Sequence, residues 1–147
     1  MTRIDFYILA DVSIDASMRF ACVLALRALR SGVSVHVHTD DRKGATALDE
    51  LMWDYPKRRF LPHALIDDSN SAQTAPIQIS WREPLLEQGL LINLCESVPS
   101  FFGRFDRVAE IIVEETRESG RERYKHYRHR GYPIHDHQLT DWEHNAA

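Results

Sequence analysis

Apolar positions divide the first half of the chain into alternating strand and helix patterns. Residues 4–9 form a short apolar run that opens with a β-branched residue, which is typical of a strand. Over residues 13–32 the apolar residues recur at helical spacing, whereas residues 33–39 alternate valine with serine or histidine as a strand does. A second helix is predicted at about 43–54, just before a proline. This β-α-β-α order predicts parallel strands joined by crossover helices.

The second half of the chain carries shorter and less regular elements. Further strands are expected within 58–66 and at 76–81, 90–94 and 108–114. The composition of residues 67–75 is that of a surface loop, and residues 99–105 favour a short helix or a turn. A last helix is expected over about 114–130, because Gly131 and Pro133 follow it and stop it.

These elements predict one α/β domain built as a layered sandwich. Its central sheet is expected to be mostly parallel, with some mixed pairing, and to carry helices on both faces. Residues 1–133 form the predicted domain, and residues 134–147, which show no clear periodicity, form a C-terminal tail of the same domain.

Composition agrees with a single globular domain and indicates a cytoplasmic protein. The chain has 147 residues, of which 44% are hydrophobic and 27% charged, enough to build a real core. No apolar run approaches the ~20 residues of a membrane helix, so no membrane association is expected. The two cysteines, Cys22 and Cys95, lie in apolar runs and are interpreted as buried, reduced thiols.

The early strands lack the glycine-rich loop of a nucleotide site. The first turn reads "LADVSIDAS", so the expected frame is Rossmann-like without a nucleotide loop, and no cofactor is predicted. Asp11, Asp40 and Asp41 follow strands, where α/β enzymes keep catalytic groups, but carboxylates there also serve as helix N-caps.

Histidines near the end of the chain raise the question of a metal site. His126 and His129 have HxxH spacing on the last predicted helix, and His135 and His137 read HxH. A zinc site needs three or four ligands at fixed geometry, and no cysteine pair or HExxH pattern supplies the rest. A solvated helix face and a polar tail explain the same residues, so no metal site is predicted.

Positive charge gathers near the C-terminus of an acidic protein. The net charge is −4, yet residues 121–130 carry five bases and one acid, which leaves −8 on the rest of the chain. On a helical wheel four cations and one ring share an arc of about 100°. These residues, called the basic arc below, are Arg117, Arg121, Tyr124, Lys125 and Arg128. Thr116, Gly120 and Tyr127 lie on the side that can face the sheet.

Three interpretations of the basic arc compete. A solvated helix would place acids first and bases last, as the helix dipole favours. A nucleic-acid site would use the cations for phosphate and the ring for stacking, but the acidic remainder of the chain argues against wide phosphate contact. A groove for an acidic, extended peptide needs cations in line for carboxylates and a ring or pocket for an anchoring side chain.

Several segments together resemble one protein family. They are "DFYIL" near the start, "ALDELMW" at 47–53, "FLPHAL" at 60–65, "PIQISW" at 76–81 and "RERYKHYR" at 121–128. Their order is similar to that in the chi subunit of bacterial DNA polymerase III. The resemblance implies an α/β subunit without catalytic activity. It also implies a bridge that links the clamp loader, through the psi subunit, to the acidic C-terminal tail of single-stranded-DNA-binding protein.

The resemblance assigns roles to individual residues. It places tail binding on Arg117, Arg121, Tyr124, Lys125 and Arg128, the residues that the helical wheel also selects. It places the contact with psi, or with a DNA-repair helicase in some relatives, on Trp53, Phe60 and Pro62. From the residues alone, Trp53 and Phe60 are as readily core side chains as interface side chains.

Two other functions remain open at this stage. One is an α/β enzyme that acts on a phosphorylated small molecule at Asp11 and Asp40, which requires a deep cavity with convergent polar groups at the strand ends. An adaptor should lack that cavity and should show a basic groove beside an apolar pocket at the last helix. The other is direct binding of single-stranded DNA. Recognition of a specific nucleic-acid sequence is not expected. The residues in 82–89 and Trp142 match no pattern.

Overall fold

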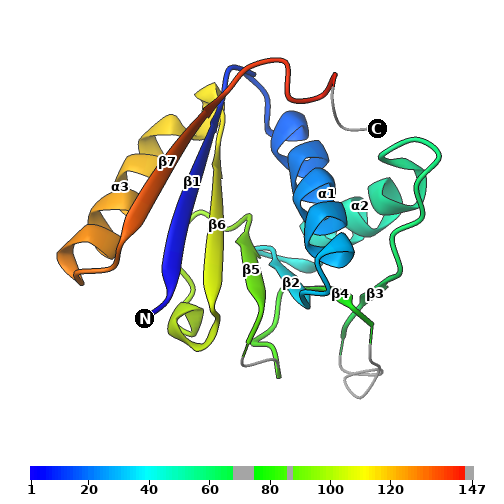
Figure 1. The fold of residues 1–147 in the computed structure, drawn as a ribbon, viewed down its shortest axis with the longest axis horizontal. Helices are drawn as coiled ribbons and strands as arrows, with labels where there is room; N and C mark the ends of the chain where they lie inside the picture. The colour runs from blue at the N-terminus through cyan, green and yellow to red at the C-terminus, as the bar shows by residue number, and fades with distance from the viewer. Residues whose placement is uncertain (68–74, 86–87, 145–147) are drawn as a thin grey trace.

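The computed structural model describes residues 1–67, 75–85 and 88–144. Within them one seven-stranded sheet has the order β3-β4-β2-β5-β6-β1-β7 (Figure 1). The strands are β1 (Arg3–Leu9), β2 (Val35–His38), β3 (His63–Leu65), β4 (Ile77–Ser80), β5 (Leu90–Asn93), β6 (Arg107–Ile112) and β7 (Ile134–Leu139). Every pairing between them is parallel, so the α/β prediction is confirmed and the sheet is more regular than the mixed one expected.

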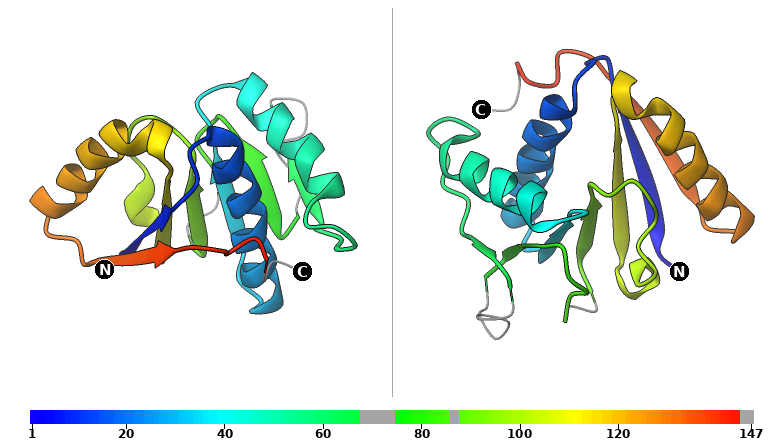
Figure 2. Two further views of the ribbon diagram at one scale, coloured as in Figure 1. Left: turned by 90° about the horizontal axis from the view of Figure 1, so that it is seen from above. Right: turned by 180° about the vertical axis from the view of Figure 1, so that it is seen from behind.

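Helices cover both faces of the sheet, as predicted (Figure 2). The α-helices are α1 (Ile14–Arg30), α2 (Arg42–Asp54) and α3 (Arg117–His129), and two short 3-10 helices are η1 (Phe102–Arg104) and η2 (Glu114–Thr116). One apolar cluster joins α1 and α2 to residues such as Val37 and Ile111, and the other joins η1 and α3 to residues such as Phe6 and Ile112. Successive strand residues therefore serve opposite faces, as the period of two requires.

The N-terminus of α2 confirms one of the predicted caps. The Asp41 carboxylate accepts a hydrogen bond from the Gly44 N–H at 2.8 Å, which satisfies one free donor of the first turn. Asp40 does not cap this helix. Its carboxylate accepts a hydrogen bond from the Glu96 N–H, across the end of the neighbouring strand β5, at 3.1 Å.

The tail contains the element that the sequence pattern missed. Residues 134–139 form β7, which pairs with β1 at the edge of the sheet. Beyond β7, the Trp142 ring packs edge-on against Phe20 at a centroid distance of 5.1 Å, and its indole N–H donates to Asp11 at 2.8 Å. Because the side chains of β7 are only partly buried, its sequence IHDHQL shows no clear alternation of apolar and polar residues.

Both cysteines are buried and unpaired, as expected. Burial raises the pKa of both thiols, and the Asp40 carboxylate raises that of Cys95 further. Among the described residues no helix has the length and apolar content needed to cross a membrane. Nor does that part of the chain gather three His, Cys, Asp or Glu side chains suited to a metal ion. Most of the predicted loop 67–75 lies outside the described residues.

Candidate partner-binding sites

Helix α3 packs closely on the sheet through one face. Gly120 and Tyr127 are buried on this face, as the helical wheel predicted. A Cβ atom at Gly120 would lie 2.5 Å from Cδ1 of Ile112 on β6, so this position has no room for a side chain. The glycine therefore brings α3 close to the sheet and fixes the distance between them.

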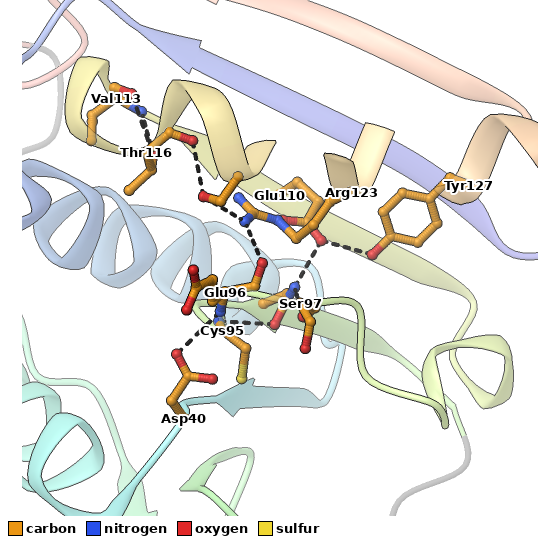
Figure 3. Close-up of polar contacts among 11 residues, drawn as sticks. Asp40, Cys95, Glu96, Ser97, Glu110, Val113, Thr116, Arg123 and Tyr127 are labelled. Carbon is orange, nitrogen blue, oxygen red and sulfur yellow. Dashed lines mark hydrogen bonds and ion pairs between the residues drawn. The ribbon is translucent and has the colours of Figure 1, made fainter. Parts of the chain in front are cut away.

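A buried polar network locks α3 to the sheet. The Arg123 Nε donates to Glu110 of β6 at 2.7 Å, and the Tyr127 hydroxyl and the Asn93 amide donate to the same carboxylate at 2.7 and 2.8 Å (Figure 3). Arg123 also reaches the Glu96 carbonyl at 2.9 Å. Burial raises the pKa of the Glu110 carboxyl, whereas Arg123 and the hydrogen bonds from Asn93 and Tyr127 lower it. Because its polar groups are partnered, this network fixes the rotation of α3 about its axis.

The basic arc lies on the opposite side of the helix. Its four cations, Arg117, Arg121, Lys125 and Arg128, are exposed, and Tyr124 is half-buried. The only ion pair formed by these cations within the described residues joins Lys125 to Glu122 at 3.5 Å, and both side chains are well exposed. The structure thus places all five predicted residues along one side of a fixed helix. Arg123, part of the same basic run, is not available to a partner.

Apolar side chains border the arc on the side of Tyr124. The Tyr124 ring meets the Phe6 ring edge-on at a centroid distance of 5.1 Å, and Ile8, Tyr132 and Ile134 pack against the same cluster. Phe6 and Ile8 belong to β1 and Ile134 to β7. An enclosed pocket for an anchoring side chain stays a prediction here, because the cavity of about 440 Å³ that contacts α3 is lined by Ser119 and Arg123, on the other flank of the helix.

The second candidate site is an exposed pair of aromatic rings. Trp53, near the end of α2, is 59% exposed, and Phe60 is 68% exposed. Their ring centroids lie 6.3 Å apart, and Pro62 beside them is half-buried. The core alternative for these rings is therefore wrong. Sequence reasoning passed over the exposed basic run Lys57, Arg58 and Arg59, which lies between the two aromatic residues in the sequence.

The two sites lie at opposite edges of the sheet. Trp53 and Phe60 precede β3, the strand at one edge, whereas α3 leads into β7 at the other edge (Figure 1). The two candidate surfaces are therefore separate.

A cavity of about 440 Å³ opens at the carboxyl ends of the strands, where an adaptor was expected to have none. Asp40 and Asp41 line it, but Asp11 does not; its carboxylate is held by Trp142. The expectation fails because the chain leaves β2 and the adjacent strand β5 toward opposite faces of the sheet, and this topology opens a crevice at their carboxyl ends. The presence of a cavity therefore does not distinguish an adaptor from an enzyme. The residues that line it must be compared with what a substrate would need.

Comparisons with known proteins agree with the resemblance in sequence. A family described as "DNA polymerase III chi subunit, HolC" matches residues 1–135. DNA polymerase III subunit chi of Pseudomonas aeruginosa is 37% identical over 142 residues, which cover 95% of this chain and 98% of the relative. The subunits chi of Haemophilus influenzae and Escherichia coli are each 32% identical, over 88% and 91% of this chain and 92% and 96% of their own lengths. The chain belongs to the DNA polymerase III chi subunit family.

Proposed function

We propose that this DNA polymerase III accessory subunit is a non-catalytic adaptor in DNA replication. In this role it connects the psi subunit of the clamp-loader complex to the acidic C-terminal tail of single-stranded-DNA-binding protein, and it works in the cytoplasm, where the chromosome is copied. The basic arc receives the tail, and Trp53, Phe60 and Pro62 receive psi or a DNA-repair helicase.

The observation that carries the proposal is the arrangement of charge on α3. Four exposed cations, of which only Lys125 is ion-paired within the described residues, follow one side of a helix whose buried side is locked by Arg123 and Glu110. A row of cations on a fixed helix suits several carboxylates of an extended peptide, since little ordering of the α3 backbone remains to be paid on binding. Tyr124 and its apolar neighbours lie beside the row and suit an aromatic residue at the end of the peptide.

The exposed rings support the second half of the proposal. Large exposed aromatic side chains mark interfaces more often than ordinary surface, and tryptophan is prominent among residues that dominate binding energy. Trp53 and Phe60 lie at the opposite sheet edge from the arc, which allows both partners to bind at once.

The enzyme alternative is weaker because the strand ends are poorly suited to a phosphorylated substrate. The first turns of α1 and α2 already donate to protein carboxylates, Glu115 and Asp41, so these donors are not free for phosphate. Burial and Asp40 raise the pKa of Cys95, which keeps this thiol protonated and a poor nucleophile at neutral pH.

Calorimetry with short peptides tests the tail site. The parent peptide is acidic and ends in Pro-Phe with a free carboxylate; one control peptide is amidated and another ends in alanine. Exposed charges are screened as the Debye length falls from ~10 Å at 0.1 M salt to ~3 Å at 1 M, whereas burial of a phenylalanine contributes about 1.5–3 kcal/mol at either salt. We therefore expect high salt to leave a residual affinity for the parent peptide that the alanine peptide lacks.

Two results would overturn the assignment. Equal affinities of the parent and alanine peptides at high salt would show a non-specific acidic-surface binder with no place for the ring. Tight binding of single-stranded DNA with a steep salt dependence, without binding of the peptide, would favour the nucleic-acid function instead.

A further inference from the structure

The sheet has a polar surface on the side of β1 and β7 that faces away from α3. Ile4 and Phe6 of β1 pack toward α3, so the alternating residues Arg3, Asp5 and Tyr7 lie on the opposite side. On that side α1 packs on the middle strands, and no helix of the described residues lies over β7 (Figure 2). This surface, called the open face below, consists of Arg3, Tyr7, Arg27, Arg107 and His137.

A buried carboxylate fixes two arginines at the open face. The Asp5 side chain is only 2% exposed, and it accepts hydrogen bonds from Arg3 Nε at 3.2 Å and from Arg107 Nε and Nη2 at 3.2 and 2.8 Å. The side chains of Arg3 and Arg107 stay 43% and 50% exposed. A guanidinium has five N–H donors, so each arginine keeps donors for a ligand while Asp5 holds it in place.

The open face is positive although the protein is acidic. Arg27, near the end of α1, is exposed. Burial and the Asp5 carboxylate raise the pKa of the Tyr7 hydroxyl, whereas Arg107, Arg27 and Arg3 lower it, so all three arginines lie near this ring. Three positive charges and one negative charge leave +2 here, against −4 for the whole chain. This charge favours an anionic partner.

Two stacked rings lie beside the arginines. The Tyr7 and His137 rings are nearly parallel, at an interplanar angle of 16° and a centroid distance of 4.8 Å. Tyr7 also contacts Phe20 of α1, and His137 is bound to Asp5 at 2.8 Å, so the stack is held in place. The His137 side chain is 34% exposed, which leaves room for a further flat ring on the stack. Unpaired bases offer such rings together with phosphates, whereas an acidic peptide offers only the charge.

We propose that the open face binds a short stretch of single-stranded DNA without preference for its base sequence. Arg3, Arg27 and Arg107 contact the phosphates, and one base stacks on the His137 ring. DNA is the strand expected for a chain of the DNA polymerase III chi subunit family. The open face and α3 lie on opposite sides of the sheet, so this site is independent of the acidic-peptide site.

Fluorescence anisotropy of a short labelled oligothymidine, titrated with the full chain, tests the proposal. Each phosphate contact to a single strand contributes about −0.7 to the slope of log K against log salt, so three arginines predict a slope of about −2. A strand of equal length that lacks the bases should bind roughly fivefold or more weakly, because it cannot stack.

Charge reversal at Arg27 separates this surface from the rest of the molecule. Arg27 is exposed and outside the Asp5 network, so Arg27→Glu should keep its Tm, weaken DNA binding about tenfold at low salt and leave peptide binding unchanged. Arg59→Glu makes the same change of charge near the opposite sheet edge and should weaken DNA binding by less than about twofold. Arg121→Glu, on the basic arc, should weaken peptide binding and not DNA binding.

A second variant isolates the ring. His137→Gln keeps a side-chain N–H for Asp5 but removes the stacking surface. It should weaken binding of the oligothymidine several-fold and leave binding of the strand without bases unchanged. A purely structural role of His137 would weaken both strands equally and would contradict the stacking contact.

Several other outcomes would overturn the proposal. They are the absence of DNA binding at low salt, equal losses in Arg27→Glu and Arg59→Glu, and equal affinity for the strand without bases. A loss confined to Arg121→Glu would place the DNA on the basic arc, and displacement of the DNA by the acidic peptide would show a surface for any anion. Peptide calorimetry is a separate measurement, so failure of the DNA site and failure of the tail site can be told apart.

Discussion

Arg121 and Arg123 are two residues apart on α3, yet their surroundings are opposite. Arg121 is exposed and has no ion-pair partner among the described residues, whereas the Arg123 side chain is 5% exposed and bonded to Glu110. Two residues along a helix turn the side chain by about 200°, so a basic run in sequence faces both solvent and core. A dense charge cluster therefore mixes exposed residues, which are available to a partner, with buried residues that hold the helix, and burial distinguishes the two groups.

Removing the buried arginine should have the largest effect. Breaking a buried ion pair by deleting one partner costs about 3–5 kcal/mol, so Arg123→Ala should lower the free energy of unfolding by that order. Arg121→Ala, the matched control on the exposed side, should change it by less than about 0.5 kcal/mol. Urea denaturation measures both. Equal losses in the two variants would contradict the difference between the two sides of α3.

The loss of folding stability caused by Arg123→Ala should also grow with pH. Without Arg123, burial would raise the pKa of Glu110 further, so this carboxyl would stay protonated in the folded state and ionise in the unfolded state. The folded state then binds more protons, and stability falls as pH rises above the unfolded pKa of about 4.3. Denaturation at pH 5 and pH 8 measures this slope. Combining Arg123→Met with Glu110→Gln leaves no unpaired charge and should recover part of the lost stability.

Charge reversal on the exposed side should affect binding and not stability. Arg128→Glu removes a charge-assisted hydrogen bond, worth about 1.5–3 kcal/mol, and adds repulsion toward an acidic tail, so it should weaken binding more than Arg128→Ala does. Arg130→Glu is a matched control, since Arg130 is exposed at the C-terminus of α3 but off the arc. Calorimetry with the acidic peptide gives the affinities. Unchanged binding by Arg128→Glu, with an intact circular dichroism spectrum, would contradict the tail assignment.

The aromatic edge offers a second comparison with the basic edge. Trp53→Ala should lower the affinity for psi, or for the helicase, by about 2 kcal/mol or more if the ring is a binding hot spot. Binding of the acidic peptide should stay the same, because the two sites lie at opposite sheet edges. Pull-down of psi and calorimetry with the peptide separate the two activities. Loss of both in a folded variant would contradict two independent sites.

Helical periodicity predicted the features of α3 that depend only on residues nearby in the sequence. The arc residues follow from the helical repeat, and the contact of Gly120 with the sheet follows from its place on the wheel. Arg123 lies at the same side of the wheel as Gly120 and Tyr127, so a signal for its burial was present. The acid Glu110 within the apolar run "VAEIIVE" was another, because a buried charge needs a partner.

Features that depend on long-range packing were harder to predict. β7 is an edge strand with one face open to solvent, so its sequence lacks the alternation that marks a strand. The exposure of Trp53 and Phe60 depends on what does not pack over them, which no local pattern reports. The cavity at the strand ends is formed by residues of α1, the turn after β2, the ends of β5 and β6, and α3, which are far apart in the sequence.

The smallest expected effect concerns a single competing acid beside the arc. Glu122 is within 3.5 Å of the Lys125 amino group, and both side chains are well exposed. Such a pair adds little to stability, but its carboxylate competes with an acidic tail for the same cation. Glu122→Gln should therefore tighten peptide binding by about twofold to threefold at low salt, and the gain should vanish at 1 M salt, where exposed charges are screened. Glu114→Gln, an exposed acid on η2, removes the same charge away from Lys125 and should give a smaller gain. If calorimetry finds the two variants equal, the benefit comes from net charge alone, and Lys125 makes no direct contact with the tail.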